Sequence, residues 1–194
     1  MLHIDESLFL GRGLHKAAYA HPEDAGKVVK IPFKADDAEL AHELAYRKSR
    51  ERRHLASQTL TAYYGTVETD LGMGYIFERV QDFDGSPCPS VKERLQELNA
   101  IGDEKAAQEA HQLAESVREA VFAERILTND TGLLNFVLQR NSPQETVIRM
   151  IDNIGSPVLI PLVYYIDRMT LHHIRKYWRR VEKRLRRDYP ALFC

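Results

Sequence analysis

Three polar side chains in the second half of the sequence are of the types that phosphoryl transfer uses. Asp130 is followed five positions later by Asn135, and Asp152 stands three positions before Gly155. Carboxylate and amide oxygens are the ligands that Mg²⁺ prefers, and a further carboxylate can accept the proton of an acceptor hydroxyl. The alternative is structural, because Asn-Asp-x-Gly and Asp-Asn-x-Gly sequences favour turns through local hydrogen bonds. Taken singly, each pattern fits that alternative better.

A second set of candidates lies near the start of the chain. Gly11 and Gly13 form half of a glycine-rich phosphate loop whose third glycine is replaced by Lys16, and a tight hairpin turn explains them at least as well. Lys30 closes an apolar strand pattern, where an inward ammonium needs a partner, although it could instead face water. We choose Glu43 on the following helix as the partner of Lys30. The alternative is that Glu43 is an ordinary solvated glutamate, which fits the same pattern.

Short strands and one helix position the candidates near the start of the chain. The pattern predicts strands over residues 7–10, 17–20 and 27–31, a helix over 35–58, and strands over 61–68 and 74–80. The turn-rich segment 81–87 is typical of a boundary. We expect an α+β protein with a small two-lobed architecture, in which residues 1–82 form a five-stranded antiparallel sheet plus one helix.

The second lobe is predicted over residues 83–194 and is mainly helical. Hydrophobic spacing indicates helices over residues 90–100 and 103–126, and two short strands over 133–138 and 146–151 bracket a polar loop at 140–144. A terminal helix carries apolar residues at alternating three- and four-residue steps from Leu171 to Leu185, so one stripe should pack while arginines line the other side.

The composition excludes several classes of protein. The chain has 194 residues, 44% hydrophobic, with 27 Lys and Arg against 28 Asp and Glu, which rules out a disordered or fibrous chain. Neither Cys88 nor Cys194 lies in a C-x-x-C or His-rich pattern, so structural zinc and thioredoxin-like chemistry have no support. The most apolar run, residues 157–166, is half of the roughly 20 residues that a membrane-spanning helix needs. With no secretory signal pattern at the start, we expect a cytoplasmic protein.

The net charge of −1 conceals a basic segment. Between residues 168 and 190, nine arginines and lysines stand against two acidic residues. Such a segment could bind the phosphates of nucleic acid or anionic lipid, or it could pair with the acidic remainder of the chain. We favour the structural role and do not favour nucleic acid as a partner, because no aromatic platform for bases accompanies the charges.

The order of these parts is that of a protein-kinase-like phosphotransferase. The sequence also resembles a bacterial family, the PhoP-regulatory-network family YrbL, whose members look kinase-like, over about residues 7–187. The resemblance rests on LGRG at 10–13, YxHPED at 19–24, VKI at 29–31, YGxVxTxLGxG at 64–74, DxDG at 82–85, NDxxxxN at 129–135 and IDNIG at 151–155.

The resemblance to kinases implies a nucleotide site in the first lobe. Gly11 and Gly13 would let the backbone approach the phosphates of ATP, and Lys30, oriented by Glu43, would hold them. The segment from Glu78 to Val80 would receive the adenine. ATP and Mg²⁺ are therefore the implied cofactors.

In the second lobe, Asp130 would position or deprotonate the acceptor hydroxyl, while Asn135 and Asp152 would bind Mg²⁺. Thr128-Asn129 replaces the usual His-Arg, and neither Phe-Gly after the metal-binding Asp nor an Ala-Pro-Glu segment is present. We therefore expect a minimal phosphotransferase with a small or unusual acceptor, which could also be a protein, in bacterial stress or envelope regulation. The alternatives are a pseudokinase that binds a nucleotide or a partner without turnover, and a binder of anionic polymers or membrane surfaces through the basic helix.

Overall fold

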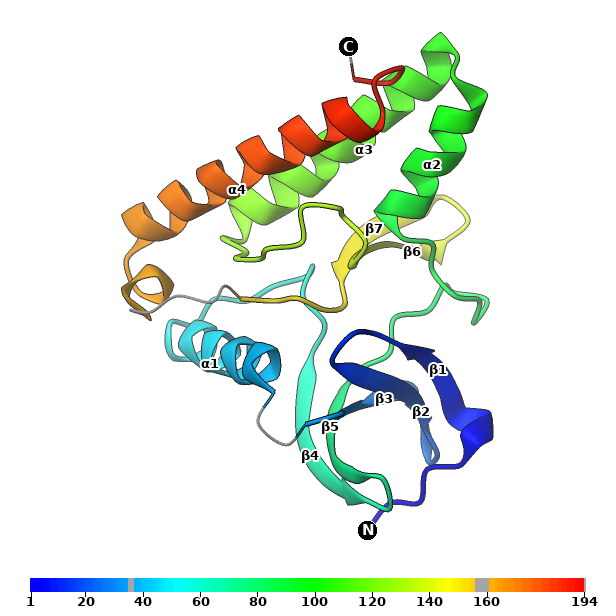
Figure 1. Ribbon diagram of the computed structural model, residues 1–194, viewed down its shortest axis with the longest axis vertical. Helices are drawn as coiled ribbons and strands as arrows, with labels where there is room; N and C mark the ends of the chain where they lie inside the picture. Colours follow the sequence, from blue (N-terminus) through cyan, green and yellow to red (C-terminus); the bar gives the residue numbers. More distant parts are fainter. Residues whose placement is uncertain (35–36, 156–160, 194) are drawn as a thin grey trace. The chain divides into compact units, whose positions relative to one another are not determined.

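The computed structural model describes residues 1–34, 37–155 and 161–193 (Figure 1). The chain forms two compact units. Unit 1 consists of Met1–Ala41 and Thr61–Val80, and unit 2 of His42–Leu60 and Gln81–Cys194. The chain contacts thus divide the protein after Val80, whereas the turn-rich pattern places the boundary after residue 82. They also assign most of the first helix to unit 2.

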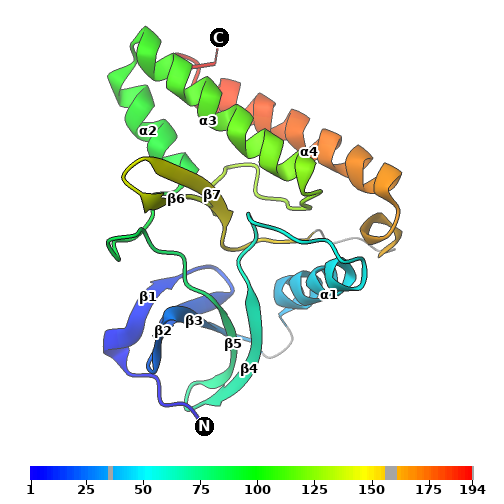
Figure 2. The same cartoon turned by 180° about the vertical axis from the view of Figure 1, so that it is seen from behind.

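Unit 1 is built on a five-stranded antiparallel sheet with the order β1-β2-β3-β5-β4 (Figures 1 and 2). The strands are β1 (Phe9–Arg12), β2 (Lys16–His21), β3 (Asp24–Pro32), β4 (Tyr63–Thr69) and β5 (Gly72–Glu78). The predicted α+β class and the five strands are confirmed. The first strand begins two residues later than predicted, because Glu6–Leu8 form a 3₁₀ turn in which the Asp5 carboxylate accepts the Ser7 N–H at 2.8 Å.

The centre of this sheet is buried on both faces. Val29 and Phe77 are fully buried, and Ile31 is nearly so. Gly74 on β5 allows the close packing, because a Cβ at this position would lie 2.6 Å from a methyl carbon of Val29. A strand covered on both faces reads as a continuous apolar run, which explains why β3 shows no alternation in the sequence.

Unit 2 combines helices with a β-hairpin. Its elements are α2 (Val91–Ile101), α3 (Glu104–Ala123), β6 (Phe136–Ser142), β7 (Glu145–Met150), the 3₁₀ turn η2 (Pro161–Tyr164), α4 (Asp167–Asp188) and the part of α1 (Ala38–Arg52) that follows Ala41. Helices α3 and α4 run side by side (Figures 1 and 2).

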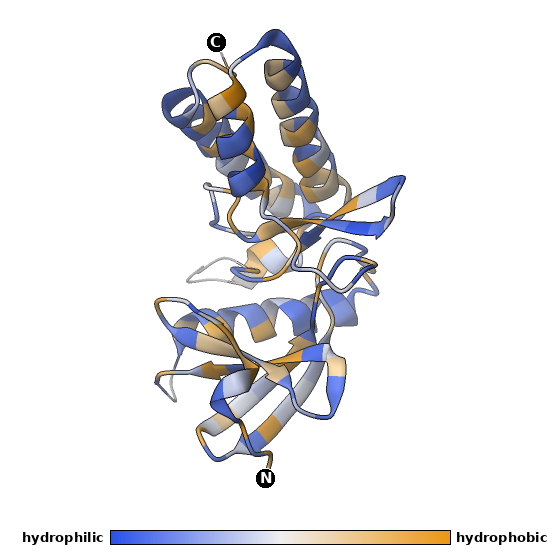
Figure 3. Ribbon diagram, turned by 90° about the vertical axis from the view of Figure 1, so that its right-hand side faces the viewer, coloured by the Kyte–Doolittle hydropathy of each residue, from blue (hydrophilic) through white to orange (hydrophobic). Residues whose placement is uncertain are grey.

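The predicted apolar stripes of α3 and α4 form the core of unit 2. On α3, Ala110, Val117 and Val121 are buried, and on α4 Trp178 and Val181 are buried. Figure 3 shows hydrophobic residues along one side of these helices and hydrophilic residues along the other. The packing stripe of the terminal helix is therefore confirmed.

Several predicted boundaries are wrong by a few residues. Helix α1 ends at Arg52 and α3 at Ala123, and β6 begins at Phe136, because His54, Arg125 and Leu133 adopt positive φ angles that regular structure does not allow. The predicted polar loop at 140–144 is shorter than expected: β6 continues to Ser142, and two residues make the turn to β7.

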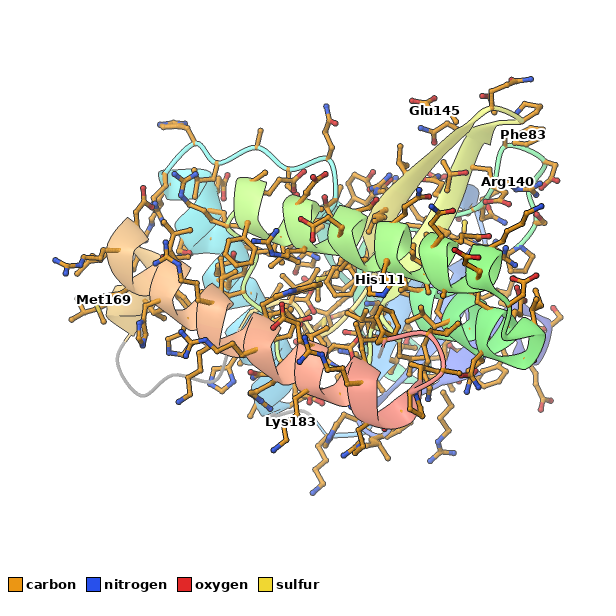
Figure 4. All side chains as sticks on the ribbon, turned by 90° about the horizontal axis from the view of Figure 1, so that it is seen from above. Phe83, His111, Arg140, Glu145, Met169 and Lys183 are labelled. Atoms are coloured by element: carbon orange, nitrogen blue, oxygen red, sulfur yellow. The ribbon has the colours of Figure 1, made fainter. Side chains whose placement is uncertain are left out.

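The β6–β7 hairpin is fastened to the segment before α2 by Asp82, whose side chain is 2% exposed. Its carboxylate accepts hydrogen bonds from the backbone N–H of Arg140 at 2.8 Å, from the guanidinium of Arg140, and from the thiol of Cys88 at 3.2 Å. Figure 4 shows Arg140 beside Phe83, whose ring centroid lies 5.4 Å from the guanidinium carbon. Burial and then the bond to Asp82 raise the pKa of Cys88 to about 12, so this thiol stays protonated at neutral pH.

The start of α2 provides a first prediction. Ser90 and Glu93 form a capping box: the Ser90 hydroxyl accepts the Glu93 N–H at 3.1 Å, and the Glu93 carboxylate accepts the Ser90 N–H at 2.7 Å. We expect Ser90→Ala to lower the free energy of unfolding by about 1 kcal/mol in urea denaturation. Ser116→Ala, on the exposed face of α3, serves as the control and should change it by less than about 0.5 kcal/mol. Equal effects would contradict the capping role.

Candidate active site

Three predicted site residues of unit 2 lie on loops that backbone hydrogen bonds hold together. The Ile151 N–H donates to the carbonyl of Asn135 at 3.0 Å, and the Gly155 N–H donates to the carbonyl of Leu127 at 2.7 Å. Between these two attachments lies Asp152. The structure therefore brings Asp130, Asn135 and Asp152 into one loop cluster, by which we mean residues 127–135 and 151–155.

The Asp130 carboxylate is held by the backbone of its own loop. One oxygen accepts the Gly132 N–H at 3.1 Å, and the other accepts the Asn135 N–H at 2.7 Å. These are the local turn bonds that the structural alternative predicts. They also fix the orientation of the carboxylate, and since two oxygens offer about four acceptor positions, each oxygen can accept a further hydrogen bond. A turn residue and a proton acceptor are therefore compatible roles for Asp130.

Helix α4 braces the same loop. The Tyr177 hydroxyl donates to the backbone carbonyl of Asp130 at 2.9 Å. Burial and then the charge of Asp130 raise the pKa of Tyr177, so its phenol remains a donor. Arg184 donates to the Thr131 hydroxyl at 3.2 Å, and a Cβ at Gly132 would lie only 3.1 Å from the Arg184 guanidinium.

Helix α1 supports the other end of the loop cluster. The buried Tyr46 hydroxyl donates to the Arg125 carbonyl at 2.8 Å and accepts the Leu127 N–H at 3.1 Å. Arg50 donates to the Glu124 carbonyl at 2.7 Å. Gly155 has a φ of 98°, a conformation that favours glycine, and a Cβ there would also make a tight contact of 3.3 Å with Tyr46 Cβ. Sequence reasoning missed these supports.

The side-chain oxygens of Asn135 and Asp152 suit a Mg²⁺ ion that takes its other ligands from a nucleotide and water. They do not form a metal site built from protein ligands alone. Among residues 1–34, 37–155 and 161–193 there is no cluster of three or more His, Cys, Asp or Glu side chains that could hold a metal. One carboxylate and one amide oxygen are hard ligands, and Mg²⁺ commonly takes only one or two protein ligands while phosphates and water supply the others. The residues present therefore fit a magnesium ion carried by a nucleotide.

In unit 1, Lys30 is buried, with 7% of its surface exposed. Its ammonium lies 4.6 Å from the centroid of the Phe77 ring, in the geometry of a cation–π contact. The alternative that Lys30 faces water is therefore wrong. A strand ammonium held against an aromatic ring has its position fixed by packing as well as by charge.

Gly11 and Gly13 lie in the β1–β2 hairpin, where the Gly13 N–H donates to the Lys16 carbonyl at 2.9 Å. The hairpin turn of the sequence alternative is thus present. Neither glycine has a positive φ, and each has room for a side chain, with no atom within 4 Å of a Cβ at Gly11. The fold of the hairpin does not require glycine at these two positions. Gly13 is exposed and Gly11 is half-buried, and neither carries a side chain that would keep a ligand away from the backbone.

Glu43 is 1% exposed and forms an ion pair of 2.7 Å with Arg47, one turn further along α1. It is therefore not a solvated glutamate. Glu43 belongs to unit 2 and Lys30 to unit 1, and their pairing stays a prediction.

The segment predicted to receive the adenine ends unit 1. The Glu78 carboxylate accepts the Ala62 N–H at 3.0 Å, and Val80 is the last residue of the unit.

The basic residues of α4 remain mostly exposed. Of the described residues, only Asp188 pairs with them, through Arg184 at 3.1 Å and Arg187 at 2.7 Å. The predicted pairing with acidic residues elsewhere is therefore absent from the described part of unit 2. No helix in the described ranges is both long and apolar enough to cross a membrane.

Comparison with known proteins shows which family this chain belongs to. The profile of the PhoP regulatory network protein YrbL matches residues 2–186. Proteins called "Uncharacterized protein YrbL" from Escherichia coli (strain K12) and Shigella flexneri are each 33% identical over 183 residues, which cover 93% of this chain and 86% of the relative. The match spans both units and includes the loop cluster. The chain therefore belongs to the PhoP regulatory network YrbL family.

Proposed function

We propose that the protein is an ATP- and Mg²⁺-dependent phosphotransferase. The observation that carries this proposal is the loop cluster, in which backbone hydrogen bonds bring Asp130, Asn135 and Asp152 together. Phosphoryl transfer of the protein-kinase type needs an acceptor-orienting carboxylate, followed by an amide and a second carboxylate that hold the metal. The order and chemistry of these three side chains match that requirement.

Unit 1 would supply the groups that bind the nucleotide. The Lys30 ammonium, fixed against Phe77, would neutralise phosphate charge, and the open backbone at Gly11 and Gly13 would approach the phosphate oxygens. The backbone between Glu78 and Val80 would receive the adenine. Glu43 would orient Lys30.

Unit 2 would carry out the transfer. The acceptor oxygen forms a bond to the γ-phosphorus while the bond from that phosphorus to the β,γ-bridging oxygen breaks, and ADP leaves with the electron pair. Asp130 takes the proton of the acceptor hydroxyl. Asn135 and Asp152 would hold Mg²⁺, which when bound would lower the repulsion between the phosphates and the incoming oxygen.

The tightest test of this site is Asp152→Ala. We expect ATP with Mg²⁺ to raise the melting temperature of the wild-type protein, because a ligand at about 100 times its Kd adds roughly 2.7 kcal/mol to the stability of the native state. Asp152→Ala should lose this shift, since one of two protein ligands to the metal is gone. The measurement is thermal unfolding with ATP, with and without Mg²⁺.

Asp84→Ala is the matched control, because Asp84 is an exposed carboxylate of the same unit outside the loop cluster. It should keep the full nucleotide shift. A wild-type protein that shows no shift at millimolar ATP and Mg²⁺ would overturn the proposed function, and so would an equal shift in Asp152→Ala.

Nucleotide binding without turnover is the second candidate. Thr128 and Asn129 stand where protein kinases carry His-Arg, and the buried Thr128 uses its hydroxyl to accept the Asp130 N–H at 3.1 Å. That contact supports the loop without supplying a catalytic group. A nucleotide shift with no ADP formation would favour this candidate. In either case we infer a cytoplasmic role in bacterial stress or envelope regulation, consistent with the family name.

A further inference from the structure

A small hollow in unit 2 lies between the loop cluster and the basic side of α4. Its volume is about 90 Å³, and it is lined by Ile126, Leu127, Thr128 and Asn129 from the chain before Asp130 and by His173, Ile174, Lys176, Tyr177 and Arg180 from α4. Sites for drug-sized ligands measure roughly 300–1,000 Å³. The hollow therefore has room for a group the size of a phosphate and does not enclose a whole nucleotide.

The charge of the lining is positive. Lys176 and Arg180 lie one helical turn apart, and none of the described residues forms an ion pair with either. Among the described residues that line the hollow there is no Asp or Glu. Burial, followed by the charge of Lys176, lowers the pKa of His173, which adds a polar ring that can accept or donate a hydrogen bond. Two cations that form no ion pair with a described residue, at a concave surface, attract a small dianion.

The hollow adjoins the residue that is proposed to take the hydroxyl proton. Asn129, on its wall, immediately precedes Asp130, and Tyr177, on the opposite wall, donates to the Asp130 carbonyl at 2.9 Å. A group bound between Lys176 and Arg180 would thus lie near the backbone of Asp130, one residue beyond the wall of the hollow. An acceptor whose phosphate group occupies the hollow could place its hydroxyl near Asp130 only if few atoms separate the phosphate from the hydroxyl.

We propose that this hollow binds the phosphate group of the acceptor, and that the acceptor is a small phosphate monoester with a free hydroxyl. The inference rests on the proposed function and names its substrate class. Lys176 and Arg180 would bind the phosphate oxygens, and Asp130 would receive the proton of the hydroxyl. The basic side of α4 then has a specific role near the middle of the helix and a solubilising role elsewhere.

The experiment is a titration of the full chain with inorganic phosphate at constant ionic strength, followed by ¹H–¹⁵N NMR. We expect saturable shifts of backbone amides in residues 127–130 and 173–180. The double variant Lys176→Gln/Arg180→Gln should weaken the affinity by about tenfold or more, because two charge-assisted contacts are lost.

The matched control is Arg179→Gln/Lys183→Gln, which makes the same change of charge on the same helix outside the hollow. Figure 4 shows Lys183 projecting from α4 away from α3. This control should keep the wild-type affinity. Equal weakening by both double variants would mean diffuse attraction to the helix and would overturn the inference, as would shifts spread along the whole of α4.

Two further measurements are needed. One distinguishes an acceptor phosphate from a nucleotide phosphate in the hollow, and the other distinguishes failure of this inference from failure of the proposed function. Displacement of inorganic phosphate by ATP would show that the hollow binds nucleotide phosphate, which overturns the acceptor assignment. Lys176→Gln/Arg180→Gln should keep the thermal shift with ATP and Mg²⁺, which Asp152→Ala loses. Phosphate binding in a wild-type protein that shows no nucleotide shift would overturn the proposed function and the acceptor role together, while the anion site itself would stand.

Discussion

Asp130→Asn is expected to bind ATP with Mg²⁺ as the wild-type protein does and to form ADP about 10²- to 10⁴-fold more slowly, the range that a positioned proton acceptor contributes. The substitution removes the acceptor of the hydroxyl proton and leaves Asn135 and Asp152 in place. Because the acceptor is small and its identity is open, ADP formation with water as the acceptor is the first readout. The affinity for ATP is measured separately by thermal unfolding.

Asparagine is preferable to alanine here because the Asp130 carboxylate also supports its loop. One oxygen of an asparagine can still accept the Asn135 N–H, whose bond to Asp130 is 2.7 Å. An alanine would lose this bond and the one to Gly132, so a drop in rate could then reflect a displaced loop. Asp130→Asn with wild-type ADP formation would contradict the assignment of Asp130, and unchanged affinity with a slow rate would support it.

Most of the fold could be predicted from the sequence because strong local signals mark it. Turn residues separate the strands of unit 1, and regular apolar spacing marks α3 and α4. The residues that shift the predicted boundaries lack such a signal, since His54, Arg125 and Leu133 are not glycines and yet adopt positive φ angles. At His54 and Arg125 local helix-end bonds accompany this conformation: the Leu55 N–H donates to the Arg50 carbonyl at 3.0 Å, and the Ile126 N–H donates to the Val121 carbonyl at 2.9 Å.

The supports of the candidate site could not be predicted for a different reason. Tyr46 and Arg50 bind backbone carbonyls more than 70 residues away, and Tyr177 binds one that is 47 residues away. A side chain that binds a distant backbone group leaves no recurring residue type at a fixed spacing. The sequence does single out Asp130, Asn135 and Asp152 as candidates, because their side-chain types and their order along the chain carry that signal.

The burial of Lys30 and Glu43 is the feature of the site that the sequence left open and the structure decides. Both side chains could have been solvated, and both are below 10% exposure. An ammonium and a carboxylate are rarely buried without a strong local reason. For Lys30 that reason includes the Phe77 ring, and for Glu43 it includes Arg47.

The largest loss of stability is expected for Asp82→Ala, about 3 kcal/mol in urea denaturation at pH 7. The substitution leaves the Arg140 N–H and the Cys88 thiol without their acceptor, in a place where the Asp82 side chain is 2% exposed. The control is Asp84→Ala, which removes a second carboxylate paired with Arg140, at 3.1 Å, from a side chain that is 46% exposed. A surface pair of this kind contributes less than about 1 kcal/mol.

A second variant, Asp82→Asn, tests whether the charge of Asp82 is what stabilises the hairpin, because the contribution of a charge depends on pH. Burial raises the pKa of Asp82, but the hydrogen bonds from Arg140 and Cys88 outweigh it, so the pKa in the folded state lies below the ordinary value of 3.8. A lowered pKa stabilises the fold fully above the unfolded-state pKa, and this contribution disappears as the pH falls through the folded-state pKa. The stability gap between wild type and Asp82→Asn should therefore be constant above about pH 5 and shrink below about pH 4. A gap that stays the same down to pH 3 would mean that the shape of the side chain, and not its charge, holds the hairpin in place.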